Sequence, residues 1–430
     1  MVWLPHWPKF HPGLPTTLGL SRIITLLKAA GSPHLKLPPT VHIAGTNGKG
    51  STVAFIQSIF EAAGLRVHRY TSPHIISFNE RILLAGQEIQ DDYLFSILEE
   101  CRIISEQHNI VVSFFEGVTA AAFLAFSRIK AEILLLEVGL GGRLDATNVI
   151  ESPLMSVITP ISYDHEKILG CTLEQIAYEK ACIMKPGRPC VVGMQTRGVY
   201  GVLSAHAQKI KAPLIQFECD FGVSITEAGN LEYKSGSCNI ATPAPSLAGY
   251  HQYINAATAI AAVSNCHSFS DEIFRAGITS ARWQGRLEKV AHGALFNTLP
   301  RSFELWLDGA HNENGAQAIA AWLADQPKKE TFLILGMTKN RDVNKFLKHF
   351  KGLAYKIICV NVYCEPLSYP GERIPTLIND SELKNIATHA TTLPEALSII
   401  QTAQKDAASR ILITGSLFLV SDFLVENGSV

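Results

Sequence analysis

The sequence predicts an α/β protein with two domains, the first built on a mostly parallel sheet with helices on both faces and the second smaller. Three observations support this prediction. The chain has 430 residues, 47% of them hydrophobic and 17% charged, which is enough for more than one hydrophobic core. Short apolar runs alternate with segments of helical periodicity from residue 41 to about 200. A second alternation of this kind begins near residue 304.

The apolar runs of the first domain are its predicted strands, and the periodic segments between them are its predicted helices. The strands are VHIA (41–44), RVHRYT (66–71), EILLLEV (132–138) and SVIT (156–159), and the helices cover about 50–63, 91–108 and 115–128. Because EILLLEV lacks polar alternation, it is typical of a strand buried on both faces. We expect it to lie in the centre of the sheet with VHIA and SVIT.

Two helix ends carry capping signals. Thr172 precedes Leu173-Glu174-Gln175, a pattern like a capping box, which predicts that a helix begins there. Gly64 follows Ala62-Ala63 and is expected to end the helix that begins near residue 50.

The second half of the chain changes character twice. Residues about 214–245 combine strand-like runs with the turn signal EAGN, which predicts a small antiparallel excursion at the edge of the first domain. Two helices are expected at about 251–265 and 270–279. The later strands are ELWLDGA (304–310), TFLILGM (331–337), YKIICVNV (355–362) and RILITGS (410–416). They predict a separate Rossmann-like α/β domain, with the join near 286–303 and domains of 1–290 and 291–430.

Charge and composition exclude several classes of function. The 37 Lys and Arg residues balance 38 Asp and Glu residues, so the chain offers no broad attraction to nucleic acid or to anionic membranes. No apolar run approaches the roughly 20 residues that span a bilayer, and the start MVWLPHWP lacks the features of a secretory signal. Nine cysteines without a CxxC pair suit a reducing compartment. We therefore expect a cytoplasmic protein without a nucleic-acid or membrane partner.

The strongest local signal is AGTNGKGST (44–52), which lies between a predicted strand and a predicted helix. Glycines allow backbone N–H groups to turn towards phosphate, and the helix N-terminus and Lys49 add positive charge. The general pattern G-x-x-x-x-G-K-[ST] is not met, because Gly50 follows Lys49. The strand and helix context nevertheless favours a phosphate loop of the P-loop type over a glycine-rich turn with a solvated lysine. The predicted nucleotide-binding residues are Gly45, Thr46, Asn47, Gly48, Lys49, Gly50 and Ser51.

Two further polar groups follow predicted central strands. Glu137 stands near the C-terminal end of EILLLEV, and Asp164-His165 follow SVIT. Ligands of open α/β sheets collect at the carboxyl ends of the strands, where a carboxylate can hold the Mg²⁺ of a nucleotide. Taken alone, Glu137 is better explained as a strand-end acid that caps a helix, and His165 as a hydrogen-bonded histidine. Their occurrence together with the phosphate loop favours a metal site.

A series of longer motifs, in order from about residue 40 to 420, resembles the folylpolyglutamate synthase/dihydrofolate synthase family, which is related to the Mur ligases. Besides AGTNGKGST they are TSPHIISFNERI (71–82), EVGLGGRLDATN (137–148), DHEKILG (164–170), EKACIMKPG (179–187), HQYINAATA (251–259), WQGRLE (283–288), LDGAHNENG (307–315) and LITGSLFLV (412–420). So many motifs in one order make the resemblance specific.

The resemblance implies ATP-dependent amide bond formation through an acyl phosphate. The expected substrates are dihydropteroate, reduced folates and L-glutamate, the expected cofactors are ATP and Mg²⁺ as two ions, and a monomer is favoured. The implied metal ligands are Ser51, Ser72, Glu137 and His165, and Lys180 matches a lysine that is carbamylated in the family. Lys49, Lys180 and His311 are the implied catalytic residues, and Asn255, Arg286 and Asp308 join the nucleotide-binding set. Without the resemblance, Lys180 would be interpreted as an exposed helix lysine.

For the substrate, the resemblance points to Phe115 and Asp145 as pterin-binding residues, an aromatic face and a carboxylate for the N–H edge of the ring. Arg81 could bind the carboxylate of the substrate or position its loop, and Ser416 is a weaker candidate for the glutamate site. By composition alone, Phe115 would be assigned to the core.

Alternatives stay open at this point. A folylpolyglutamate synthase without the dihydropteroate activity is the nearest, and a nucleotide-dependent regulatory protein that has lost ligation is another. A Mur-type ligase acting on a UDP-linked peptide is disfavoured, because about 40 residues before the phosphate loop leave no room for a UDP-binding domain. Cys182 and Tyr163 depart from the family pattern beside Lys180 and His165, and the first 30 residues match it only loosely.

Overall fold

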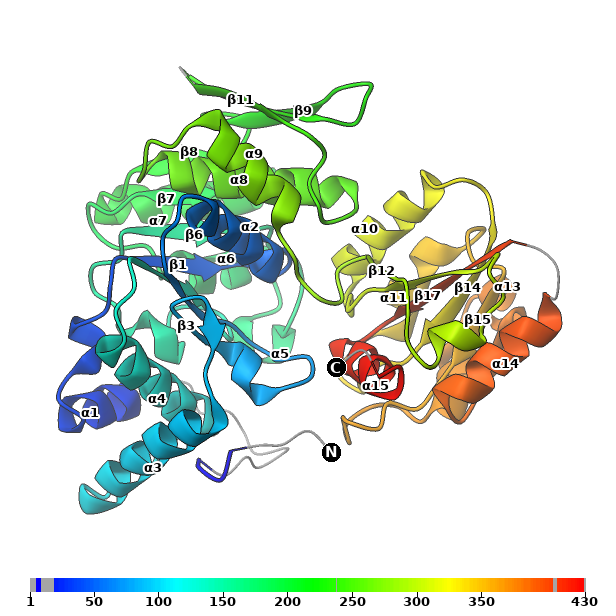
Figure 1. The fold of residues 1–430 in the computed structure, drawn as a ribbon, viewed down its shortest axis with the longest axis horizontal. Coiled ribbons are helices and arrows are strands. Elements are labelled where there is room, and N and C mark those ends of the chain that lie inside the picture. The colour runs from blue at the N-terminus through cyan, green and yellow to red at the C-terminus, as the bar shows by residue number, and fades with distance from the viewer. Residues whose placement is uncertain (1–4, 9–18, 237, 405–407, 429–430) are drawn as a thin grey trace. The chain divides into compact units, whose positions relative to one another are not determined.

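A computed structural model describes residues 5–8, 19–236, 238–404 and 408–428, which form two compact units (Figure 1). The larger unit contains the described residues up to 246 together with 251–282, and the smaller contains 247–250 and the described residues from 283 onwards. Each unit is an α/β fold around its own sheet, as the sequence predicts. No helix in the described ranges is long and apolar enough to cross a membrane.

The larger unit is built on an eight-stranded sheet in the order β4-β3-β2-β5-β1-β6-β7-β8. All neighbouring strands are parallel except for the antiparallel pairs β2–β3 and β3–β4. The strands are β1 (Thr40–Ala44), β2 (Val67–Tyr70), β3 (Ile82–Leu84), β4 (Gln87–Glu88), β5 (Ile133–Glu137), β6 (Met155–Ile158), β7 (Cys190–Val192) and β8 (Leu214–Gln216). The predicted central position of EILLLEV, VHIA and SVIT is confirmed, because they form the adjacent strands β5, β1 and β6.

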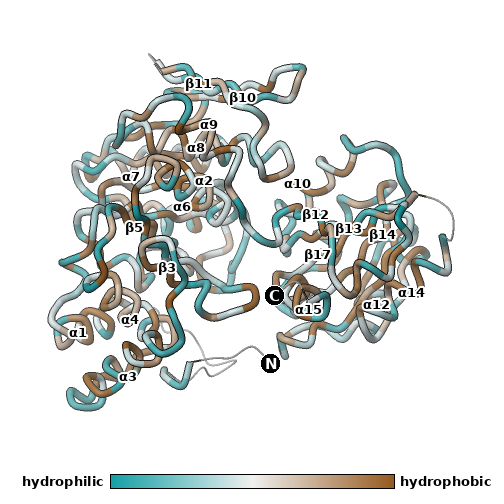
Figure 2. The backbone as a smooth tube through the Cα atoms, viewed as in Figure 1, coloured by the Kyte–Doolittle hydropathy of each residue, from teal (hydrophilic) through white to brown (hydrophobic). Residues whose placement is uncertain are grey.

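Helices cover both faces of this sheet. They are α1 (Ser21–Ala29), α2 (Lys49–Ala62), α3 (Asp91–Gln107), α4 (Phe114–Arg128), α5 (Glu166–Leu169), α6 (Leu173–Ala181), α7 (Arg197–Ile210), α8 (Tyr250–Ser264) and α9 (Asp271–Ser280). Residues of α1, α3 and α4 share a core with β5, while α6 and α7 pack on β6 and β7. Helix α2 packs against α9, and Figure 1 shows α2, α8 and α9 together. Hydrophobic residues are concentrated in central strands such as β5 (Figure 2).

Most predicted elements appear with small shifts at their ends, but the excursion near 214–245 needs a correction. Residues 214–216 form β8, a parallel edge strand of the main sheet, because they pair with β7. The antiparallel part is a separate three-stranded sheet of β9 (Gly222–Ile225), β10 (Leu231–Ser235) and β11 (Cys238–Thr242). The capping box at Thr172 is confirmed, and Gly64 follows α2 with a positive φ of 78°.

The smaller unit has a six-stranded sheet in the order β12-β13-β17-β14-β15-β16, parallel except for the pair β12–β13. Its strands are β12 (Glu288–Val290), β13 (Glu304–Leu307), β14 (Glu330–Leu335), β15 (Lys356–Cys359), β16 (Ala387–His389) and β17 (Ser409–Thr414). Its helices are α10 (Glu313–Ala324), α11 (Val343–Leu347), α12 (Ile374–Leu377), α13 (Ser381–Asn385), α14 (Leu393–Ala403) and α15 (Leu417–Glu426). Short edge elements such as β12 and β16 escaped the sequence analysis, because three residues carry little periodicity.

Candidate active site

The carboxyl ends of β1, β5 and β6 bring the main predicted groups of the larger unit to one edge of the sheet. The phosphate loop follows β1, Glu137 ends β5, and Asp164 and His165 follow β6. Since β5, β1 and β6 are adjacent and parallel, these groups are neighbours in the fold although they are far apart in sequence. This is the edge at which open α/β sheets bind their ligands.

Two glycines of the phosphate loop lie so close to neighbouring side chains that a Cβ at either position would clash. Gly48 caps α2 with a φ of 82°, and a Cβ at this position would lie 2.5 Å from Oδ1 of Asn255. A Cβ at Gly45 would lie 1.8 Å from Oγ1 of Thr159. The loop is therefore in close contact with α8 on one side and with the end of β6 on the other.

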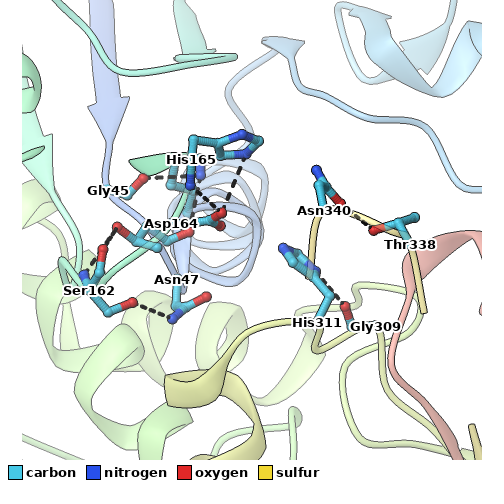
Figure 3. Close-up of polar contacts among 11 residues, drawn as sticks. Gly45, Asn47, Ser162, Asp164, His165, Gly309, His311, Thr338 and Asn340 are labelled. Carbon is cyan, nitrogen blue, oxygen red and sulfur yellow. Dashed lines mark hydrogen bonds and ion pairs between the residues drawn. The ribbon is translucent and has the colours of Figure 1, made fainter. Parts of the chain in front are cut away.

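Hydrogen bonds join the phosphate loop to the segment that follows β6 (Figure 3). The N–H groups of Thr46 and Asn47 donate to the carbonyl of Pro160 at 3.0 and 3.2 Å. Oγ1 of Thr46 donates to the carbonyl of Ser162 and accepts from its N–H, both at 3.1 Å, and Nδ2 of Asn47 donates to Oγ of Ser162 at 3.2 Å. Nζ of Lys49 donates to the carbonyls of Gly45 and Thr46, at 3.2 and 3.3 Å. Sequence analysis missed Ser162, since only the fold brings it to the loop.

The predicted metal ligands differ in their surroundings. Ser51 and Glu137 are buried, and Oε2 of Glu137 accepts from the N–H of Ser72 at 3.3 Å, so β5 and the loop after β2 meet here. His165 has a left-handed φ of 51°, and its Nε2 lies 3.6 Å from Oδ1 of Asp164 (Figure 3). Among the described residues, no three His, Cys, Asp or Glu side chains are grouped to hold a metal. The hydroxyls and carboxylate present fit Mg²⁺, which commonly completes its shell with phosphate oxygens and water.

Lys180 is only 5% exposed, so the interpretation as an exposed helix lysine, made without the family resemblance, is wrong. Burial and the nearby charge of Lys49 lower the pKa of its ammonium group from 10.5 to about 7, and Asp164 and Asp145 oppose this shift. The loop after β5 contacts the same turn of α6. A Cβ at Gly142 would lie 3.1 Å from Cα of Lys180.

Further hydrogen bonds fasten this loop to the end of α6. The N–H of Arg143 donates to the carbonyl of Glu179 at 2.8 Å, and Nε of Arg143 donates to Oε1 of Glu179 at 2.9 Å. Nδ2 of Asn148 donates to the carbonyl of Cys182 at 3.2 Å. The motif GGRLDATN thus caps the helix that carries Lys180, and Cys182 contributes a backbone carbonyl to that contact.

Phe115 and Asp145, the predicted pterin-binding pair, both meet the turn that follows β5. The ring of Phe115 lies against Gly139, where a Cβ would be 2.4 Å from the ring. Oδ2 of Asp145 accepts from the N–H of Leu140 at 2.9 Å. Asp145 is 3% exposed, and this burial raises the pKa of its carboxyl while hydrogen bonds from Thr147 and Leu140 oppose the shift.

Arg81 lies at the end of the loop after β2, and the structure shows how that loop is held. Oε1 and Oε2 of Glu80 accept from the N–H groups of Ile75, Ile76 and Ser77 at 2.5 to 2.7 Å. Nε of Arg81 donates to Nδ1 of His74 at 2.8 Å, and its guanidinium lies 5.2 Å from the ring centre of Phe78.

The imidazole of His74 can act as that acceptor because it is neutral. Burial and the charge of Arg81 lower the pKa of His74 to about 3. Sequence analysis missed both Glu80 and His74, although they lie in the motif that includes Ser72 and Arg81.

In the smaller unit, Arg286, Asp308, His311 and Ser416 gather around the ends of β13 and β17. Oδ2 of Asp308 accepts from the N–H of Leu287 at 2.8 Å and Oδ1 from the N–H of Ala310 at 2.7 Å. Burial raises the pKa of the Asp308 carboxyl, and the charge of Arg286 opposes this. The segment WQGRLE is thereby fixed beside LDGAHN.

His311 and Ser416 complete this group. Nδ1 of His311 lies 3.0 Å from the carbonyl oxygen of Gly309 (Figure 3), and Ser416 caps α15 by accepting from the N–H of Phe418. Because Ser416 already has this capping role, its hydroxyl is fixed at the start of a helix.

Asn255 and a residue that sequence analysis did not single out, Gln252, form a pair on α8. Oε1 of Gln252 accepts from Nδ2 of Asn255 at 3.0 Å, which leaves Oδ1 of Asn255 towards Gly48. Gln252 and Asn255 are one helical turn apart, a spacing that could have identified the pair.

Comparison with known proteins agrees with these observations. Residues 43–263 match the Mur ligase middle domain, and residues 292–426 match the C-terminal domain of dihydrofolate synthetase. The dihydrofolate synthase/folylpolyglutamate synthase of Bacillus subtilis is 34% identical over 420 residues, which is 94% of each chain.

Two solved structures are also similar over nearly their whole length. Escherichia coli FolC in complex with DHPP and ADP has a TM-score of 0.86 at 27% identity, covering 97% of this chain and 95% of its own. The bifunctional folylpolyglutamate synthase/dihydrofolate synthase of Yersinia pestis, complexed with AMPPNP and manganese, has a TM-score of 0.85 at 27% identity, with 96% and 95% covered. The chain therefore belongs to the dihydrofolate synthase/folylpolyglutamate synthase family of ATP-dependent ligases.

Proposed function

We propose that this protein joins L-glutamate to dihydropteroate and to reduced folates, using ATP and an acyl phosphate intermediate. The observation that carries the proposal is the meeting of a phosphate loop and the buried Glu137 at one sheet edge, with the buried Lys180 close enough to Lys49 for their charges to interact. The structure of one relative with the same fold contains DHPP and ADP, and that of another contains AMPPNP and manganese.

The chemistry explains why these groups are needed. A carboxylate oxygen of the acceptor attacks the γ-phosphorus of ATP, ADP leaves, and the amine of glutamate then attacks the acyl carbon. Phosphate departs with the C–O bond electrons, and the amine loses a proton. Because the transferring phosphoryl group carries negative charge, cations and oriented N–H groups around it stabilise the transition state.

The nucleotide would be held by Gly45 to Ser51 and by Asn255, with Lys49 moving from its own loop carbonyls to the outer phosphates. Ser51, Ser72, Glu137 and His165 would bind Mg²⁺, as two ions in all. When bound, Mg²⁺ supplies positive charge that neutralises the phosphate oxygens. The contact of Ser72 with Glu137 supports a shared site for these two residues.

Carbamylation of Lys180 is part of the proposal. Only a neutral amine reacts with CO₂, and a lysine with a pKa of about 7 is largely neutral at physiological pH, unlike an ordinary lysine. The carbamate would place an anion near the positive charge of Lys49. The hydrogen bonds of Arg143 and Asn148 would hold the end of α6 that carries this side chain.

Asp308, His311 and Ser416 belong to the proposed domain 291–430, and their proposed roles are in nucleotide binding, catalysis and glutamate binding respectively. Arg286, at the end of the proposed domain 1–290, is a further proposed nucleotide-binding residue. Asp308 would act mainly by holding the segment of Arg286, since both of its oxygens accept backbone hydrogen bonds. Residues 1–290 would form the other domain. We further propose that the protein acts as a monomer in the cytoplasm.

For the acceptor, Phe115 and Asp145 would bind the pterin ring, with Arg81 near its carboxylate end. Phe115 and Asp145 flank the same two-residue turn, Gly139-Leu140, which supports a common site. This pair favours activity with dihydropteroate over a folylpolyglutamate synthase alone.

The test is ADP release by the purified protein with ATP, Mg²⁺ and L-glutamate, comparing dihydropteroate, tetrahydrofolate and no acceptor. Release with both acceptors supports the bifunctional enzyme. Release with tetrahydrofolate alone selects the second candidate, a folylpolyglutamate synthase. Release with neither, in the presence of bicarbonate, would contradict the proposal and favour a regulatory protein.

A further inference from the structure

A buried chain of hydrogen bonds runs from the central strand β1 to the carboxylate of Asp145. Nε2 of His42 lies 2.9 Å from Oγ1 of Thr147, and Oγ1 of Thr147 donates to Oδ1 of Asp145 at 2.5 Å. The N–H of Thr147 donates to the same oxygen at 2.9 Å. His42 and Thr147 are both 0% exposed, so both side chains are shielded from bulk solvent.

The chemistry of the three groups fixes the direction of this chain. An ionised carboxylate can only accept, so the hydroxyl of Thr147 uses its proton towards Asp145. That hydroxyl must then accept from His42, which places the imidazole proton on Nε2. Burial lowers the pKa of His42 to about 3, so the imidazole is neutral and has a single N–H to give.

The second nitrogen of His42 supports this assignment. Nδ1 is buried without a hydrogen-bond partner among the described residues. In the tautomer deduced here Nδ1 is an unprotonated acceptor, and an unpartnered buried polar atom is costly. His42 also lies on the central strand, beside Leu136 of β5 and Ser156 of β6. An apolar residue would pack in this position without that cost, so stability alone does not explain the histidine.

These hydrogen bonds decide which carboxylate oxygen of Asp145 can still accept a hydrogen bond from a bound molecule. Oδ1 accepts two hydrogen bonds from Thr147, which uses the two lone pairs of that oxygen. Oδ2 accepts from the N–H of Leu140. By these hydrogen bonds, Oδ2 is the oxygen with a lone pair left for a donor on a bound molecule, and it contacts the same turn, Gly139-Leu140, against which Phe115 packs.

We propose that His42 and Thr147 are positioning residues of the acceptor site: the imidazole orients the hydroxyl of Thr147, which holds the Asp145 carboxylate so that Oδ2 alone faces an N–H of the pterin ring. This inference rests on the proposed function, since it takes a pterin as the acceptor. The ring is thereby recognised through one oxygen in one orientation, stacked by Phe115.

Thr147→Val tests this directly, because it keeps the shape of the side chain and removes only the hydroxyl. We expect the KM for dihydropteroate to rise about tenfold or more, as for the loss of a hydrogen bond to a charged group, while kcat and the KM for ATP change less than about threefold. Thr147→Ser restores the hydroxyl and is expected to restore the KM. His42→Leu should raise the same KM, because the Thr147 hydroxyl then loses the group that orients it.

Thr331→Val is the matched control, since Thr331, on β14 of the smaller unit, is also a buried threonine with a hydrogen-bonded hydroxyl. It should leave the KM for dihydropteroate unchanged. If Thr147→Val keeps the wild-type KM, or if it lowers kcat and both affinities equally, the positioning role is refuted. If the unmodified protein releases no ADP with either pterin acceptor, the proposed function itself fails. If it accepts tetrahydrofolate only, the same variants are compared with that acceptor.

Discussion

Oδ1 of Asn255 lies 2.5 Å from the position that a Cβ of Gly48 would occupy. The phosphate loop and helix α8 are separated by about 200 residues, yet they meet without room for a methyl group. Gln252 holds the amide of Asn255 in this orientation. The close approach therefore makes the shape of the loop depend on a helix that follows it late in the chain.

Gly48→Ala should abolish nucleotide binding. The new methyl group would displace Asn255, and the φ of 82° is unfavourable for any residue with a Cβ. Gly64→Ala is the matched control, because Gly64 has a similar φ of 78° but nothing within 4 Å of its Cβ position. It should cost about 1 kcal/mol of stability and leave nucleotide affinity unchanged. Titration with ADP measures the nucleotide affinity of both variants, and thermal unfolding measures their stability. If the two variants bind ADP equally well, the role given to Gly48 is contradicted.

Lys180→Met should eliminate ligation while making the protein more stable near pH 6. In the folded state the pKa of Lys180 is lowered from 10.5 to about 7, so between these values the unfolded chain binds more protons than the folded one. Stability must then rise with pH across this window, and below pH 7 the buried charge destabilises the fold. Methionine removes that charge.

The measurement is the melting temperature of both proteins from pH 6 to 10 without bicarbonate. The advantage of the methionine variant should shrink as the pH rises. A constant difference would contradict the lowered pKa of Lys180, whatever the effect on activity.

Glu137→Gln should lower the ligation rate about 10²-fold or more and raise the Mg²⁺ concentration needed for half-maximal activity, because a buried anionic ligand is lost. The amide still accepts the hydrogen bond from Ser72, so the fold is expected to persist. Glu132→Gln, just before the same strand, is the control, since Glu132 makes an exposed ion pair with Arg66. Ligation rates measured over a range of Mg²⁺ concentrations distinguish Glu137→Gln from Glu132→Gln. An unchanged Mg²⁺ requirement in Glu137→Gln would exclude the ligand role.

Glu80→Gln should loosen the loop between β2 and β3. The carboxylate of Glu80 accepts from three consecutive N–H groups, and an amide has only one oxygen to offer them. Loss of hydrogen bonds to a charged group costs about 1.5–3 kcal/mol each. Amide hydrogen exchange at Ile75 to Ser77 should become faster, while exchange in β5 stays slow. Glu88→Gln on the neighbouring β4 serves as control, and unchanged protection in Glu80→Gln would count against this clamp.

Much of the fold could be predicted from local pattern. Strands β1, β5 and β6 were predictable because a parallel central strand is buried on both faces and appears as an uninterrupted apolar run. The site residues that follow these strands were predictable for the same reason. By contrast, β8 was assigned to the antiparallel excursion, since three half-buried residues show no periodicity and its pairing with β7 depends on the whole sheet.

The sequence by itself determined the class of fold, the phosphate loop and the family, because glycines, a lysine and apolar runs act through short-range geometry and backbone burial. Only the tertiary structure decided the surroundings of the side chains. Without the family resemblance Lys180 would be interpreted as an exposed helix lysine, but it is buried, and burial together with the nearby charge of Lys49 lowers its pKa to about 7. The alignment of His42, Thr147 and Asp145 likewise arises from contacts over about 100 residues of chain. Electrostatic environment and hydrogen-bond direction depend on such long-range packing, which no local pattern encodes.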